Sequence, residues 1–211
     1  MKAMHEPIWR CYLEHRDLDQ LRDEVLSTPW YKSPEEAGDS LLMRAVEQGD
    51  AGAAKVLMAL GESPSLPARD GFTFLHKAID TVSAAEAGAK RDAALEVIVA
   101  LLTGGADPNV QGVDGAPLHR AAGAGLIEAA RMLLAHGANI EARMRTDGEL
   151  TPLMHAASMN QPALVRCLLD AGADRLAISG PSLVDAALTL PALLAKRKVS
   201  HANEILDMLG Q

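Results

Sequence analysis

The sequence predicts an all-α fold built from stacked helix–turn–helix units, and two observations predict it. The first is composition: 48% of the 211 residues are apolar but only 3% are aromatic, with Ala and Leu supplying most of the apolar content. Small residues let short helices pack closely, whereas a β-sandwich needs more aromatic and β-branched side chains. The second observation is a pair of short phrases that recur along the chain in a fixed order.

The first phrase reads as the start of a helix and occurs four times. A Ser or Thr at its first position can cap free backbone N–H groups, and a Pro after it has no N–H to lose. Leu and Ala then face inward. The four copies are Ser40–Ala45, Thr73–Ala78, Ala116–Ala121 and Thr151–Ala156. Their central leucines, at positions 42, 75, 118 and 153, are 33, 43 and 35 residues apart.

The second phrase reads as the end of a helix and follows each copy of the first. Two apolar residues precede a Gly, which can adopt the left-handed conformation that closes a helix. One such unit is too small to bury its apolar face, so we expect the units to stack into one continuous core. The four copies are Val56–Gly61, Val99–Asp107, Met132–Asn139 and Cys167–Asp174.

Together the two phrases resemble the ankyrin-repeat family over about residues 40 to 176. The third and fourth copies match its T-P-L-H-x-A pattern most closely. The resemblance implies a helical solenoid that binds other proteins through its concave face and the loops between repeats. It also implies that His76 and His119 tie neighbouring loops together through hydrogen bonds to backbone. Met43 and Met154 occupy that place in the other two units, and His155 is displaced from it by one residue.

We expect a single domain over 1–211. Ile8 precedes Leu42 by 34 residues, which indicates a degenerate first unit with Trp9, Tyr12 and Trp30 covering the end of the core. The segment Ser182–Ala187 is expected to open the last unit, with a second helix at about His201 to Leu209. The predicted divisions are an N-terminal cap at 1–38, repeats at 39–70, 71–113, 114–146 and 147–180, and a C-terminal repeat or cap at 181–211.

Three departures from the period are expected to be insertions. The step of 43 residues places about ten extra residues between two helices, near Thr81 to Arg91. A similar stretch at Leu190 to Ser200 contains Lys196, Arg197 and Lys198, and the step of 35 lengthens the loop Glu141 to Leu150. Surface loops tolerate insertions, so either neutral drift or function accounts for them.

Composition and motifs argue against several function classes. A net charge of −8 argues against nucleic acid as the main partner. The sequence holds no phosphate-binding loop, no zinc-ligand spacing, no H-E-x-x-H and no G-x-S-x-G elbow, so we expect no cofactor, no metal and no catalysis. Cys11 and Cys167 are expected to be reduced thiols, although one bridge between them is left open. No apolar run suggests a signal or membrane segment, so we expect a cytoplasmic monomer, with dimerisation through an imperfect end of the stack as the alternative.

A basic column points to the expected partner-binding surface. Equivalent positions of successive repeats lie about 10 Å apart, and the position after the T-P-L-H slot is mostly basic. Glu47 and Asp80, three residues further on, are placed to neutralise two members of the column, whereas no such acid follows Arg120 or His155. The column reads Arg10, Arg44, Lys77, Arg120, His155 and Asp185.

We therefore expect a binding patch centred on the third and fourth clear units, facing an acidic or mixed partner surface. The alternative is that the loop arginines pair with Glu141, Asp147 or Glu149, and that the apolar candidates pack beneath their loops. The patch comprises Arg120, His155, Met159, Arg143, Met144 and Arg145, with Arg44 and Lys77 continuing the column and Phe72 and Leu150 as apolar anchors.

The function expected from these features is non-catalytic protein binding. An adaptor in a larger complex and a dedicated inhibitor of one partner, such as an immunity protein or antitoxin, both fit the pattern. The lack of a second domain in the sequence favours the one-partner inhibitor. An enzyme is the remote alternative, since no residue supports it.

Overall fold

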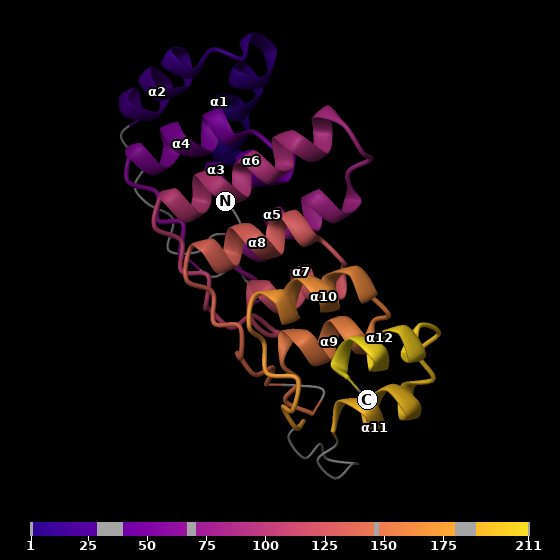
Figure 1. Cartoon of the computed structure of the whole chain (residues 1–211). Helices are drawn as coiled ribbons and strands as arrows, with labels where there is room; N and C mark the ends of the chain where they lie inside the picture. The colour runs from indigo at the N-terminus through magenta and orange to yellow at the C-terminus, as the bar shows by residue number, and fades with distance from the viewer. Residues whose placement is uncertain (1, 29–39, 67–70, 146–147, 180–188, 211) are drawn as a thin grey trace. The chain divides into compact units, whose positions relative to one another are not determined.

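The architecture is helical throughout the part of the chain that the computed structural model describes, residues 2–28, 40–66, 71–145, 148–179 and 189–210 (Figure 1). No β-strand occurs among these residues; isolated bridges join Gly112 to Gly115 and Ile178 to Thr189. The expected all-α repeat fold is confirmed. The chain divides into two units, Met1–Asp107 and Pro108–Gln211, which are described separately below.

Unit 1 consists of three helix pairs. Helix α1 packs on α2, α3 on α4, and α5 on α6. Between pairs, the first helix α3 packs on the first helix α5, and the second helices α2 and α6 both pack on the second helix α4. The bounds are α1 Lys2–His15, α2 Leu18–Ser27, α3 Leu41–Gln48, α4 Ala51–Ala59, α5 Phe74–Ala84 and α6 Ala89–Thr103.

Unit 2 repeats the same arrangement. Helices α7, α9 and α11 stack as first helices, and α8, α10 and α12 stack as second helices. Each first helix also packs on the second helix that follows it. The bounds are α7 Pro117–Gly123, α8 Ile127–Ala135, α9 Pro152–Ser158, α10 Pro162–Asp170, α11 Leu190–Arg197 and α12 Ala202–Leu209.

The repeated phrases start the first helices in the way their chemistry predicts. The hydroxyl oxygen of Ser40 accepts a hydrogen bond from the backbone N–H of Met43 at 3.0 Å, and Thr151 accepts one from Met154 at 3.3 Å. Both caps satisfy N–H groups that have no partner inside the helix. The central leucines Leu42, Leu75, Leu118 and Leu153 are at most 1% exposed, so the predicted inward face is confirmed.

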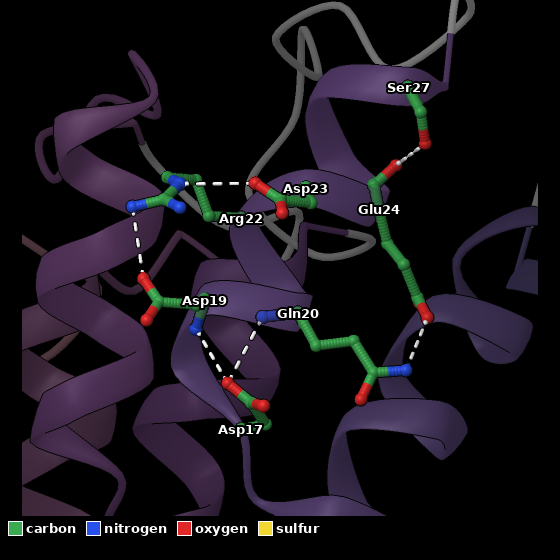
Figure 2. Close-up of polar contacts among 7 residues, drawn as sticks. All are labelled: Asp17, Asp19, Gln20, Arg22, Asp23, Glu24 and Ser27. Atoms are coloured by element: carbon green, nitrogen blue, oxygen red, sulfur yellow. Dashed lines mark hydrogen bonds and ion pairs between the residues drawn. The ribbon is translucent and has the colours of Figure 1, made fainter.

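The N-terminal pair α1 and α2 covers one end of the unit 1 core, as expected. Trp9 and Tyr12 are each 3% exposed, and Leu21 and Val25 of α2 are buried with them. Trp30, expected to join this cover, lies outside the described residues. Figure 2 shows the solvent side of α2, where Asp17 caps the helix and Arg22 bridges two exposed aspartates.

The first expected insertion lengthens helices, so the prediction of extra residues in the turn is wrong. Helices α5 and α6 have 11 and 15 residues, against 7 and 9 for α7 and α8. The turn between α5 and α6 covers only residues 85–88. Residues 81–84 form the last turn of α5, where Val82 is fully buried, and residues 89–91 form the first turn of α6.

The second expected insertion is also wrong. The stretch from Leu190 forms α11, which packs on α9 and therefore serves as the first helix of the last pair. Thr189 and Pro191 stand near its start in the manner of the repeated phrase. The segment expected to hold that helix, Ser182–Ala187 with Asp185, lies outside the described residues. The second helix, α12, begins at Ala202 and ends at Leu209 close to its predicted bounds.

Candidate functional site

Polar side chains tie the loops of unit 2 to one another. The side chain of Asn109 accepts a hydrogen bond from the backbone N–H of Asn139 at 2.7 Å and donates one to the carbonyl oxygen of Gly137 at 3.0 Å. One repeat further on, Glu141 accepts a hydrogen bond from the backbone N–H of Asp174 at 2.7 Å. These bonds hold each loop to the next, and they occupy Glu141, which had been a candidate partner for the loop arginines.

The lengthened loop between α8 and α9 folds back on itself. The backbone N–H of Met144 donates to the carbonyl oxygen of Leu150 at 3.1 Å. Arg143 then donates from Nη1 to the carbonyl oxygens of Glu149, at 3.1 Å, and of Ile178, at 2.5 Å, so it joins this loop to the one after α10. We call the described loop residues of unit 2 the loop row; they are 108–116, 139–145, 148–150 and 171–179.

The loop row exposes large apolar side chains that the sequence reasoning missed. Val113 is 52% exposed, Leu176 71% and Ile178 50%. Ala177 and Ser179 are buried, so side chains from Leu176 to Ser179 alternate between outside and inside. This alternation of large apolar and small residues was the signal available in the sequence. Exposed apolar side chains are common singly, but these three belong to loops that hydrogen bonds tie one to the next.

His119 holds the loop before α9, as the family resemblance implied. The ring is fully buried, and its Nδ1 accepts a hydrogen bond from the backbone N–H of Ala116 at 3.2 Å. This leaves Nε2 protonated, and it donates to the carbonyl oxygen of Leu150 at 3.0 Å. Burial lowers the pKa of His119 to about 4, so the ring is neutral in this role. His76 is equally buried, and its Nδ1 accepts from the N–H of Thr73 at 3.2 Å.

Two members of the expected patch are already engaged within unit 2. Arg120 makes an ion pair with Asp114 at 2.8 Å, so the expectation that no acid neutralises it is wrong. The acid comes from the preceding loop instead of from the same helix. His155 is half-buried, and its Nδ1 lies 3.1 Å from the carbonyl oxygen of His119. Its ring also fills the space that a side chain at Gly123 would occupy.

Two further members are core residues, and their expected exposure is wrong. Met144 is 4% exposed and Leu150 1%, because the folded-back loop turns both side chains inward. The alternative, that Leu150 packs beneath its loop, is confirmed. Phe72 in unit 1 is half-buried, and the ammonium group of Lys77 lies 5.1 Å from the centre of its ring.

The other candidates differ in exposure. Arg143 and Arg145 are exposed, and Met159 is 49% exposed at the end of α9. Arg44 of α3 is half-buried, while Arg10 of α1 is exposed. The predicted pairs of Arg44 with Glu47 and Lys77 with Asp80 stay predictions. Asp147, a candidate partner for the arginines, lies outside the described residues.

One buried carboxyl stands apart from these surfaces. Glu62 follows α4, is 4% exposed, and accepts a hydrogen bond from the backbone N–H of Leu42 at 3.2 Å. Burial raises its pKa to about 7, although hydrogen bonds from the N–H groups of Leu42 and Leu41 oppose this shift. Its other oxygen, Oε1, is buried without a partner. The equivalent positions in the later repeats are alanines, Ala106, Ala138 and Ala173.

The described residues offer no candidate metal site. No group of three His, Cys, Asp or Glu side chains is placed to hold a metal ion within those ranges. Both cysteines, Cys11 and Cys167, are free thiols. A hydrogen bond to Glu24 and burial raise the pKa of the Cys11 thiol, which favours the less reactive protonated form. In the described part of the chain, every helix is too short or too polar to cross a membrane.

Comparison with sequence families agrees with the geometry. A family model for ankyrin repeats, in three copies, matches residues 83–177. The match begins within α5 and ends in the loop after α10. Comparison with curated proteins gave no match.

Proposed function

Since residues 83–177 match a family model for ankyrin repeats, which are generally protein–protein interaction modules, we propose that the chain binds a partner protein and does not catalyse a reaction. The partner is held by the concave face and the loops between repeats. In unit 2 the main contact surface is the loop row.

The exposed apolar side chains of the loop row are the observation that carries this proposal. Val113, Leu176 and Ile178 are each at least 50% exposed, although the loops that bear them are fixed by hydrogen bonds. Burying apolar surface contributes roughly 25 cal/mol per Å² to association. Loops that are already ordered lose little entropy on binding, so more of this contribution remains as affinity.

Charge at the loop row suggests the nature of the partner surface. Arg145 is exposed in the middle loop, beside Arg143, and the chain as a whole has a net charge of −8. Exposed cations on an otherwise acidic protein favour an acidic rim on the partner, which speeds encounter and sets register more than it adds affinity. The partner surface proposed is therefore apolar at its centre and acidic at its edge. Arg120 contributes less, because Asp114 already balances its charge.

Affinity capture from the native source, followed by mass spectrometry, tests the proposal. The test variants are Ile178→Asp with Leu176→Asp, and Arg145→Glu alone. We expect the apolar pair to reduce capture of the specific partner at least tenfold and Arg145→Glu to reduce it less, with a stronger effect at low salt. The matched controls are Arg166→Glu and Val99→Asp, which change exposed residues on second helices. Equal capture by all variants would contradict the loop row as the binding surface.

A dedicated inhibitor is the more specific alternative. It is distinguished from a scaffold by affinity, because an inhibitor of a toxic enzyme needs a subnanomolar Kd whereas a scaffold works in the micromolar range, a difference of about 4 kcal/mol. A gene for a toxin-like enzyme beside the gene for this protein would favour the inhibitor. The Kd for the captured partner, measured by calorimetry or by binding to the immobilised protein, decides between the two roles.

A further inference from the structure

A groove opens in unit 1 beside the long hairpin of α5 and α6. The hairpin itself can be followed in Figure 1. Its volume is about 770 Å³, and it is lined by the end of α3, by α5, by the α5–α6 turn and by the start of α6. Four alanines supply its apolar surface: Ala84, Ala85, Ala89 and Ala93. Ala84 and Ala89 are exposed, and the other two are half-buried.

The groove exists because neighbouring helix pairs differ in length. The pair α3 and α4 turns at Gly49, where an added Cβ would lie 3.7 Å from the backbone nitrogen of Ala94 in α6. Helix α6 begins five residues before that contact, and α5 is three residues longer than α3. The extended part of the hairpin therefore passes beyond α3 and α4. Elsewhere in unit 1, small residues such as Ala53, Ala54 and Ala94 are buried at helix contacts.

The chemistry of this surface is that of a helix-packing face. Alanine side chains let a helix backbone approach closely, and the groove continues the interface along which α3 packs on α5 and α4 on α6. An extended strand laid against these methyl groups would leave backbone N–H and C=O groups without partners. A helix satisfies those groups internally, so a helix is the favoured occupant.

The rim of the groove carries charges of both signs. Glu47 comes from the last turn of α3 and Lys90 from the first turn of α6, and both are exposed. Lys77 and Asp80 of α5 also line the groove and are half-buried. The two exposed charges come from different helices, so they can discriminate the direction in which a charged helix lies.

We infer that this groove binds a short α-helix of a partner protein, with small side chains on its packed face, a basic residue facing Glu47 and an acidic residue facing Lys90. The inference rests on the proposed protein-binding function and adds a second surface, in unit 1, to the loop row of unit 2. It assigns a role to the lengthened α5–α6 hairpin, which the loop row does not use.

Selection from a displayed library of 18-residue helical peptides tests the inference with the full-length chain as target. The enriched peptides are expected to share small residues at i, i+3 and i+4 spacing, with flanking charges of both signs. Ala84→Arg, which places a long cation over the apolar surface, is expected to weaken their binding at least tenfold. Ala59→Arg, at an exposed alanine of α4, is the matched control and is expected to leave binding unchanged.

A charge swap makes the test specific to the groove. Lys90→Glu is expected to weaken the selected peptide at least threefold, and replacement of the peptide's acidic residue by Lys is expected to restore binding. Helix content and melting temperature are measured for each variant, and Lys90→Glu provides the test if Ala84→Arg does not fold.

Three results would overturn the inference. They are enrichment of non-helical sequences alone, equal peptide binding by the Ala84→Arg and wild-type proteins, or a dimer of this chain that Ala84→Arg dissolves. Ile178→Asp with Leu176→Asp is expected to leave peptide binding intact. Failure of the loop row and failure of the groove are therefore distinguishable.

Discussion

The phenolic hydroxyl of Tyr12 donates a hydrogen bond of 2.6 Å to the carboxylate of Asp50, which ties α1 to the turn between α3 and α4. Arg16 reaches the same carboxylate oxygen at 2.9 Å, while the other oxygen caps α4 by accepting from the N–H of Ala53 at 2.9 Å. Burial and the bond to Asp50 raise the pKa of Tyr12 to about 12, so the phenol keeps its proton through the neutral range. One carboxylate thus joins the N-terminal helix pair to the next repeat.

Asp50→Ala should destabilise the protein more than Tyr12→Phe. The first change removes a helix cap and leaves a buried phenol without an acceptor, which costs about 2–3 kcal/mol. The second removes one hydrogen bond and costs about 1 kcal/mol. Urea unfolding followed by circular dichroism measures both.

Asp23→Ala is the control for Asp50→Ala. Asp23 lies on α2, its side chain is 70% exposed and its ion pair is with Arg22 (Figure 2). Exposed pairs of this kind contribute about 0–1 kcal/mol, so little change is expected. Equal losses for Asp50→Ala and Asp23→Ala would show that the Tyr12 contact does not hold the N-terminal pair in place.

His119 should make unit 2 sensitive to mild acid. Its folded pKa of about 4 lies below the value of about 6.5 for an unfolded imidazole, so the unfolded chain binds the proton more readily. The stability is present above pH 6.5 and is lost as the pH falls towards 4, by about 2 kcal/mol between pH 7 and pH 5. Relative to the wild type, His119→Gln should lack this gain in stability between pH 5 and pH 7, which denaturant unfolding at both pH values measures. The exposed His136, changed to Gln, is the control.

Glu62 should make the stability of unit 1 depend on pH in the opposite direction. Its folded pKa of about 7 lies above 4.5, the ordinary value for a glutamate carboxyl, so the folded chain binds the proton more readily. Stability is present below pH 4.5 and is lost as the pH rises through 7, by about 2 kcal/mol between pH 5 and pH 7. Glu62→Gln keeps an acceptor for the N–H of Leu42 without the buried charge, so it should be more stable than the wild type at pH 8.

The two titrations are best separated by single variants. Between pH 5 and pH 7 the loss from Glu62 and the gain from His119 are similar in size and opposite in sign. The wild type should therefore show a shallow pH profile in this range. Glu62→Gln should gain stability with rising pH, and His119→Gln should lose it. Parallel profiles for the two variants would contradict this account.

Local chemistry explains which parts of the fold were predictable from the sequence. A Ser or Thr cap acts on the N–H groups two or three residues away, so Ser40 and Thr151 mark helix starts without tertiary information. The central leucines follow from the same spacing. Helix α11, the first helix of the last pair, was not predicted at its true position. In Thr189-Leu190-Pro191 the Pro stands one position later than in the other copies, whereas Ser182–Ala187 resembles the usual phrase.

The contacts of side chains in the expected binding patch were less predictable, because loop geometry determines them. The bond of Arg120 to Asp114 spans six residues and depends on the turn at Gly112 to Gly115, which helical spacing does not describe. The loop after α8 likewise reverses at Gly148 and Glu149, both with positive φ, and so turns Met144 inward. The basic column showed which positions are neighbours, but it did not show which of their side chains already make contacts within the chain.

Met144 and Arg145 should therefore respond differently to substitution, although they are adjacent in the loop. Met144→Ala removes a buried side chain beneath the loop and should destabilise the protein by about 2–4 kcal/mol. Arg145→Ala changes an exposed side chain and should alter stability by less than about 0.5 kcal/mol. Thermal unfolding measures both, and capture of the partner by each folded variant separates binding from stability. If Arg145 contributes to the rim of the interface, its loss should lower the association rate more than it raises the dissociation rate, and added salt should diminish the difference. A Met144→Ala protein as stable as the wild type would show that the loop does not contribute to the core of unit 2.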